Sequence, residues 1–296
     1  MNSRERLENV LSGQPIDRTP VAFWKHFPGD DQRSADFAYA TINFQRRFDW
    51  DFVKVTPAST SYVLDYGVKD RWQGQNNGDR TPTKFVVQRS LQWTELRTID
   101  PERGEYGKQL EALRMIEQGL QDTQTPLIVT IYSPLSQATR IGSKALLLRH
   151  LRTRPDRLRT GLNIITEGIL RFMDALKRIN IAGLYSVTEF ADYDQLSEQE
   201  YQVFGTPYDQ KILDMIPQRW WLNILQIRGS APMFDLFGNY RIQALNWDCC
   251  EAEPNLADAK LRFGGVLCGG LNHISDMDQS SPTIVPERAR NALQLM

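Results

Sequence analysis

The chain has 296 residues, of which 41% are hydrophobic and 24% charged, so it can bury a large core and wholesale disorder is excluded. Its 35 Lys and Arg residues against 36 Asp and Glu residues give a formal net charge of -1, which disfavours a nucleic-acid binder. There is no run of about 18 apolar residues, so we expect no membrane span. The polar start and the three cysteines predict no signal peptide and no disulfide framework, and therefore a cytoplasmic protein.

Short apolar runs alternate with longer segments of helical periodicity along the chain. The runs are of strand length, and Leu158–Ile179 is the clearest helical segment between them. Strand and helix in alternation predict a parallel sheet, and seven runs predict one (β/α)8 barrel domain over residues 1–296. An open doubly wound sheet is the alternative. The runs are Thr19–Trp24, Asp51–Thr56, Pro126–Ser133, Ala182–Thr188, Leu222–Arg228, Arg241–Trp247 and Gly264–Gly270.

Two features depart from a regular barrel. The turn sequence Asn76–Asp79 stands between the alternating runs Tyr62–Gly67 and Lys84–Leu91, which predicts a β-hairpin inserted after the second strand, over one mouth of the barrel. The chain also ends at Met296, after a predicted helix and without an eighth strand. Because a closed barrel needs that strand, we expect a domain that is incomplete at its C-terminus.

Polar side chains gather where the predicted strands end, and in barrel enzymes these ends form the active site. Cations that face into such a cup are costly unless they pair or meet an anion, so the site predicts a small anionic, carboxylate-bearing substrate. An internal ion pair such as Lys54 with Glu189 is the alternative. The candidates are Lys25, His26, Lys54, Tyr132, Glu189, Asp192, Gln226, Arg228, Asn246, Asp248, Asn272 and His273.

Histidines and cysteines are few enough to be weighed one by one. His26 and His273 follow predicted strands and are functional candidates, whereas His150 lies in the basic stretch 149–154 and is expected at the surface. Cys249 and Cys250 are adjacent, a spacing that does not suit zinc. We therefore expect neither a metal site nor a cofactor.

Several motifs follow one another along nearly the whole chain. They are Arg4–Leu7, Leu11–Gly13, Asp17–Val21, Ser133–Ser136, Leu196–Glu198 through Pro207 and Tyr208, and Gly269–Asn272. Their order and spacing resemble the uroporphyrinogen decarboxylase superfamily over about residues 4 to 295. The resemblance implies a single (β/α)8 barrel, often a homodimer, with its site at the C-terminal mouth. Members either decarboxylate uroporphyrinogen without a cofactor or move methyl groups to and from corrinoids with the help of zinc.

The sequence departs from both activities at the matching positions. The aspartate of the decarboxylases falls on or next to Ala58, their tyrosine on or near Arg140 and their serine near Ala191. Their arginine-containing loop is replaced by Trp24–Gln32, and their late histidine would lie beyond the last residue. The H-x-C motif of the zinc methyltransferases is replaced by Gln226–Arg228, so zinc is not expected.

The resemblance still favours a uroporphyrinogen decarboxylase-like carboxy-lyase acting on a tetrapyrrole or another carboxylate-bearing substrate. Glu189, Asp192 and His26 are its expected catalytic residues, and the other candidates, with Arg140, are expected to bind substrate. One alternative is a corrinoid-dependent methyltransferase without zinc, in which Arg228 binds an anionic methyl donor and a corrinoid protein is the partner. A second alternative is a non-catalytic protein that binds a tetrapyrrole or a small acid.

Overall fold

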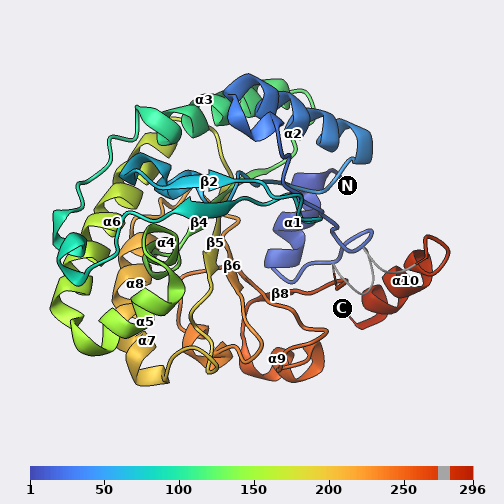
Figure 1. The fold of residues 1–296 in the computed structure, drawn as a ribbon. Helices are drawn as coiled ribbons and strands as arrows, with labels where there is room; N and C mark the ends of the chain where they lie inside the picture. Colours follow the sequence, from blue (N-terminus) through green and yellow to red (C-terminus); the bar gives the residue numbers. More distant parts are fainter. Residues whose placement is uncertain (273–280, 296) are drawn as a thin grey trace.

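A parallel sheet lies at the centre of the computed structural model, which describes residues 1–272 and 281–295 (Figure 1). The strand order is β1-β4-β5-β6-β7-β8, so each strand pairs with the next one along the chain. This confirms the predicted α/β class with parallel strands, and all six strands lie within predicted runs. They are β1 (Val53–Val55), β4 (Leu127–Tyr132), β5 (Gly183–Thr188), β6 (Ile224–Ile227), β7 (Ala244–Asn246) and β8 (Val266–Cys268).

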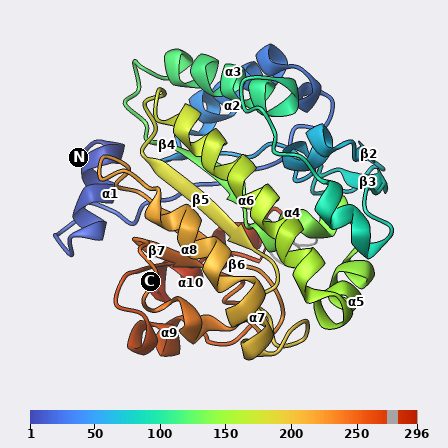
Figure 2. The same ribbon diagram turned by 90° about the vertical axis from the view of Figure 1, so that its left-hand side faces the viewer.

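Helices follow the strands and cover the outer face of the sheet. Figure 2 shows α6 and α8 lying in front of β5. The predicted helix over Leu158–Ile179 is confirmed as part of α6, which begins at Pro155 and ends at Leu176. The helices are α1 (Ser3–Leu11), α2 (Ser34–Phe48), α3 (Gly104–Gly119), α4 (Pro134–Ile141), α5 (Lys144–Thr153), α6 (Pro155–Leu176), α7 (Glu198–Phe204), α8 (Thr206–Asp214), α9 (Leu256–Arg262) and α10 (Val285–Leu295). Within the described residues, none of them is both long and apolar enough to cross a membrane.

The predicted hairpin is present, but its strands differ from the expected ones. It consists of β2 (Lys69–Arg71) and β3 (Thr81–Lys84), which pair antiparallel. The expected strand Tyr62–Gly67 is instead largely a 3-10 helix, Ser61–Tyr66. Tyr62 and its neighbour Val63 are both buried, and a strand with one solvated face would have exposed one of them.

The run Thr19–Trp24 was predicted as the first strand, and this prediction is wrong. Asp51 donates its backbone N–H to the Val21 carbonyl at 2.9 Å, but the Val21 N–H is taken by the Asp51 carboxylate at 2.7 Å. Pro20 has no N–H to donate. The segment therefore lies beside β1 without a backbone ladder, and β1 is one edge of the sheet in the described residues.

Asp51 also ties the N-terminal segment to the sheet by charge. Its carboxylate is fully buried and accepts hydrogen bonds from Arg6 Nη1 at 2.5 Å and Arg18 Nη1 at 2.6 Å. Arg6 is buried as well and holds Asp17 at 2.7 Å. One buried carboxylate thus gathers two arginines and a backbone N–H from residues 6–21.

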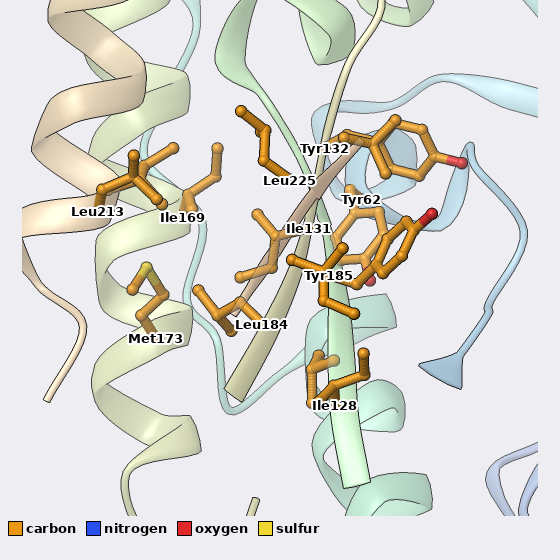
Figure 3. Packing of buried hydrophobic residues seen from close by; sticks show 14 of the residues in the cluster. Tyr62, Ile128, Ile131, Tyr132, Ile169, Met173, Leu184, Tyr185, Leu213 and Leu225 are labelled. Carbon is orange, nitrogen blue, oxygen red and sulfur yellow. The ribbon is translucent and has the colours of Figure 1, made fainter. Parts of the chain in front are cut away.

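The two faces of the sheet differ in character (Figure 3). Ile131 and Leu184 point toward α6 and α8 and belong to the main hydrophobic core. Tyr132 and Tyr185, the next residues along β4 and β5, lie on the opposite side. This alternation follows from the period of two along a strand. The helices therefore cover one face of the sheet, and polar side chains can occupy the opposite, inner face.

Candidate active site

Strand register places a row of polar side chains on the inner face near the carboxyl ends of the strands. Val187 on β5 pairs with Tyr132 and with Gln226, Gln226 pairs with Asn246, and Asn246 pairs with Cys268. Directly paired residues point to the same face of a sheet. The structure therefore brings the predicted residues Tyr132, Gln226 and Asn246 together. The Asn246 side chain is already engaged by the Tyr185 hydroxyl and the Cys268 carbonyl, both at 2.6 Å.

The amine of Lys54 is buried on the same inner face, between two aromatic rings. Its Nζ lies 4.9 Å from the ring centroid of Trp24 and 4.4 Å from that of Tyr185, and it donates a hydrogen bond to Thr56 Oγ1 at 3.2 Å. In the described residues no carboxylate lies within 4 Å of it. Burial, helped by the positive charge of Arg228, lowers the pKa of Lys54 to about 7.

Glu189 holds two arginines and is not the partner of Lys54. Arg140 forms two hydrogen bonds with its carboxylate, at 2.6 and 2.9 Å, and Arg228 Nη1 adds a third at 3.2 Å. Burial alone would raise the pKa of Glu189, but the guanidinium groups outweigh it and the net shift is downward. The alternative of a Lys54–Glu189 ion pair is therefore not formed, and Glu189 stays ionised.

The hairpin adds a carboxylate that sequence reasoning missed. Asp79 Oδ1 lies 3.8 Å from His26 Nε2 and accepts the backbone N–H of Ser59 at 2.8 Å. Burial lowers the pKa of His26, and Asp79 opposes that shift only in part. Ser59 follows Ala58, where the superfamily pattern had left no acidic group. The turn sequence Asn76–Asp79 was the available signal, because it marked a turn over the mouth.

Asp192, predicted as catalytic, has its carboxylate engaged by backbone. Oδ1 accepts the N–H of Asp194 at 2.7 Å, and Oδ2 accepts the N–H of Ser230 at 3.1 Å. Gly229 approaches so closely that a Cβ there would lie 1.9 Å from Asp192 Oδ2. Asp192 therefore joins the loops that follow β5 and β6, which is a structural contact.

Four predicted substrate-binding residues lie at the edge of the site or outside the described residues. Lys25 is exposed, with its amine 5.4 Å from the Phe27 ring centroid. Asp248 is exposed and accepts a hydrogen bond from the buried Asn272 at 3.3 Å. His273 lies outside the described residues.

His150 was expected at the surface, and this prediction is wrong. It is buried, and its Nδ1 accepts a hydrogen bond from Trp93 Nε1 at 3.0 Å. The basic stretch around it is amphipathic, since Leu147, His150 and Leu151 form the buried side of α5. A spacing of three and four residues places all of them on one helix face, and this signal was present in the sequence.

The residues of the site do not fit zinc. Across residues 1–272 and 281–295, no three His, Cys, Asp or Glu side chains gather so as to hold a metal. The end of β6, where related zinc enzymes were expected to carry ligands, holds Gln226 and the cation Arg228. Neither of these side chains is a zinc ligand, so the end of β6 does not provide a zinc site.

Comparison with known proteins finds similarity to methyltransferases. Two curated relatives are methylcobamide:CoM methyltransferases MtbA. The protein from Methanosarcina acetivorans is 21% identical over 99% of this chain and 89% of its own length. That from Methanosarcina mazei is 22% identical over 77% and 70%. A solved methyltransferase from Methanosarcina mazei, 16% identical, superimposes with a TM-score of 0.81 over 99% of this chain and 90% of its own.

These findings correct the expected reaction and support the expected fold. The curated relatives are transferases, so the prediction of a lyase that decarboxylates a tetrapyrrole in porphyrin biosynthesis is wrong. The structural match agrees with the α/β class inferred from the strand pattern. The family model for uroporphyrinogen decarboxylase (URO-D) matches residues 2–295. Since this match spans nearly the whole sequence, the chain belongs to the URO-D family.

Proposed function

We propose that the protein is a methyltransferase that moves a methyl group between a methylated corrinoid, carried by a partner protein, and a small anionic acceptor. The methylcobamide:CoM methyltransferases that match the chain over most of its length support this reaction class. The residues that depart from the decarboxylase pattern, above all Ala58, fit it as well. We further propose, from the family resemblance, a single cytoplasmic barrel domain that forms homodimers.

The observation that carries the acceptor class is the shared carboxylate of Glu189. Two guanidinium groups, from Arg140 and Arg228, bind this one carboxylate, so the cluster keeps a net positive charge. The Arg228 side chain is 49% exposed, whereas that of Arg140 is 13% exposed. Arg228 therefore has donors open to a ligand. Arginine is well suited to bind a carboxylate, sulfonate or phosphate group.

Methyl transfer sets two requirements for the site. The acceptor atom attacks the methyl carbon, the bond from that atom to carbon forms, and the cobalt–carbon bond breaks with its electron pair left on cobalt. The acceptor must first lose its proton, and its anionic end must be held so that the attacking atom faces the methyl group. Arg228 and Arg140 provide the second requirement.

Methylcobalamin and a panel of thiols test the proposal directly. The protein, treated with a chelator, is incubated with methylcobalamin and CoM (2-mercaptoethanesulfonate), with 3-mercaptopropionate, or with uncharged 2-mercaptoethanol. We expect methylated product, detected by mass spectrometry, with the two anionic thiols, and much less with the uncharged thiol at equal concentration. If no acceptor is methylated, with methylcobalamin or with a methylated corrinoid protein as donor, the proposal is wrong.

Removal of the exposed arginine should weaken acceptor binding selectively. We expect Arg228→Ala to raise KM for an anionic thiol about ten- to a hundredfold, the loss of one charged hydrogen bond worth about 1.5–3 kcal/mol. KM for 2-mercaptoethanol should stay nearly unchanged. The control is Arg171→Ala on α6, which removes an exposed arginine paired with Glu167. Equal effects on charged and uncharged thiols would place Arg228 outside the acceptor site.

A further inference from the structure

The amine of Lys54 lies in surroundings that suit a base more than a permanent cation. It is enclosed by the rings of Trp24 and Tyr185, and it donates a hydrogen bond to the neutral hydroxyl of Thr56. Aromatic faces attract an ammonium group, so the site tolerates the charged form. Without a carboxylate within 4 Å among the described residues, however, the charged form is not held permanently.

The charged groups that face Lys54 come from three segments around the mouth. Arg228, after β6, repels a positive charge on the amine, and Asp79, on the hairpin, attracts it. The positive charge of Lys54 also lowers the pKa of His26, which precedes α2. Arg228, the arginine proposed to bind the acceptor, is thus one of the charged groups that act on the Lys54 amine. The mutual effects bring the pKa of Lys54 to about 7, so the amine is mostly neutral at pH 8.

We propose that Lys54 is the catalytic base that takes the proton from the nucleophilic atom of the acceptor, a small thiol with an anionic group. This role rests on the proposed methyltransferase function and names the residue that does, in this chain, what a bound metal does elsewhere. The chain offers no zinc ligands at the end of β6, where Gln226 and Arg228 stand. A metal-free site needs another way to form the thiolate.

The step balances without any further reactant. The thiol gives its proton to the Lys54 amine, which yields a thiolate and an ammonium group between the two aromatic rings. The thiolate sulfur then forms a bond to the methyl carbon, and the cobalt–carbon bond breaks with its electron pair left on cobalt. Lys54 returns its proton to solvent after the methylated product leaves.

Proton counting during binding tests the role without requiring turnover. The binding heat of 3-mercaptopropionate is measured in two buffers of different ionisation enthalpy, which gives the number of protons released. At pH 8 the thiol of 3-mercaptopropionate is almost fully protonated, because its carboxylate keeps the thiol pKa above that of a cysteine side chain. We expect the wild-type protein to release about zero protons at pH 8, because Lys54 keeps the proton. At pH 6, where Lys54 is already charged, it should release about one.

The matched variant is Lys54→Arg, which keeps the positive charge but cannot accept a proton. Since arginine pairs with a thiolate whose proton has gone to the buffer, this variant should release about one proton at pH 8. Lys54→Met provides a second variant that does not bury a larger group, and it should bind the thiol without proton release at pH 6. Circular dichroism and thermal melting establish that each variant is folded.

Methyl transfer by the same variants completes the test. At pH 8 we expect kcat to fall about 10²- to 10⁴-fold in Lys54→Met, the usual contribution of a general base. Lys54→Arg should lose much less, because it binds the acceptor as a thiolate. The deficit should shrink above the pKa of the thiol, because the thiolate is then present without a base. If wild-type protein transfers methyl groups but releases about one proton at pH 8, Lys54 is not the base and the proposed function stands. Absence of methyl transfer to every acceptor overturns both.

Discussion

Replacement of Asp51 by alanine is expected to lower the free energy of unfolding by about 3–5 kcal/mol, the usual cost of removing one partner from a buried ion pair. The Asp51 carboxylate is fully buried and binds Arg6, Arg18 and the N–H of Val21. Its loss leaves the buried Arg6 with only the more exposed Asp17 as charged partner. Denaturation by urea, followed by circular dichroism, measures the change.

The control for this prediction is an ion pair at the surface. Asp122 binds Arg46 at 3.1 Å, and both side chains are at least half exposed. Asp122→Ala should therefore cost about 0–1 kcal/mol. A loss below about 1 kcal/mol for Asp51→Ala would show that the first 24 residues contribute little to the stability of the sheet.

The stability of the wild-type protein is expected to fall as the pH rises from about 4 to about 7, because Asp209 holds its proton in the folded state. Burial raises the pKa of Asp209 to about 7, and the hydrogen bond from Tyr201, at 2.5 Å, opposes the shift only in part. In the unfolded chain the group loses its proton near its ordinary pKa of 3.8. The folded state thus binds more protons between these values, and its stability falls with rising pH.

Asp209→Asn should remove this dependence. The amide keeps an acceptor for the Tyr201 hydroxyl and carries no charge at any pH. At about 1.4 kcal/mol per unit of pKa, the variant should exceed the wild type in stability by about 4 kcal/mol at pH 8 and match it near pH 3.5. Asp214→Asn, an exposed site at the end of α8, is the control and should change stability little. A variant less stable than wild type at pH 8 would mean that Asp209 is ionised when folded.

The sheet could be predicted from the sequence because its signals are local. Six of the seven apolar runs contain the six strands of the parallel sheet. The prediction of a strand over Thr19–Trp24 failed because of a contact that is distant in the sequence. The N–H of Val21 is taken by the side chain of Asp51, 30 residues later in the chain. A pattern within the run carries no information about that partner.

Several residues of the candidate site could be named from the sequence, but their contacts could not. Lys54, Arg140, Glu189 and Arg228 were all named, whereas Asp79 was missed, and an ion pair of Lys54 with Glu189 was left open as the alternative. Which cation meets the carboxylate depends on the reach of side chains from different strands, and the two arginines occupy it. The aromatic enclosure of Lys54 likewise combines three distant segments. The lyase prediction was wrong because the family resemblance covers two chemistries and the one favoured was not that of the curated relatives.

The position of Asp79 has a consequence for how such a site can diversify. Glu189, after β5, is held by two arginines, whereas the carboxylate of Asp79 beside His26 lies on the turn between β2 and β3. A loop tolerates changes in length and sequence far better than a buried strand does. This second carboxylate can therefore be gained, moved or lost through changes in the hairpin, while the sheet remains as it is. Changes in the hairpin can therefore alter which ligands the site binds.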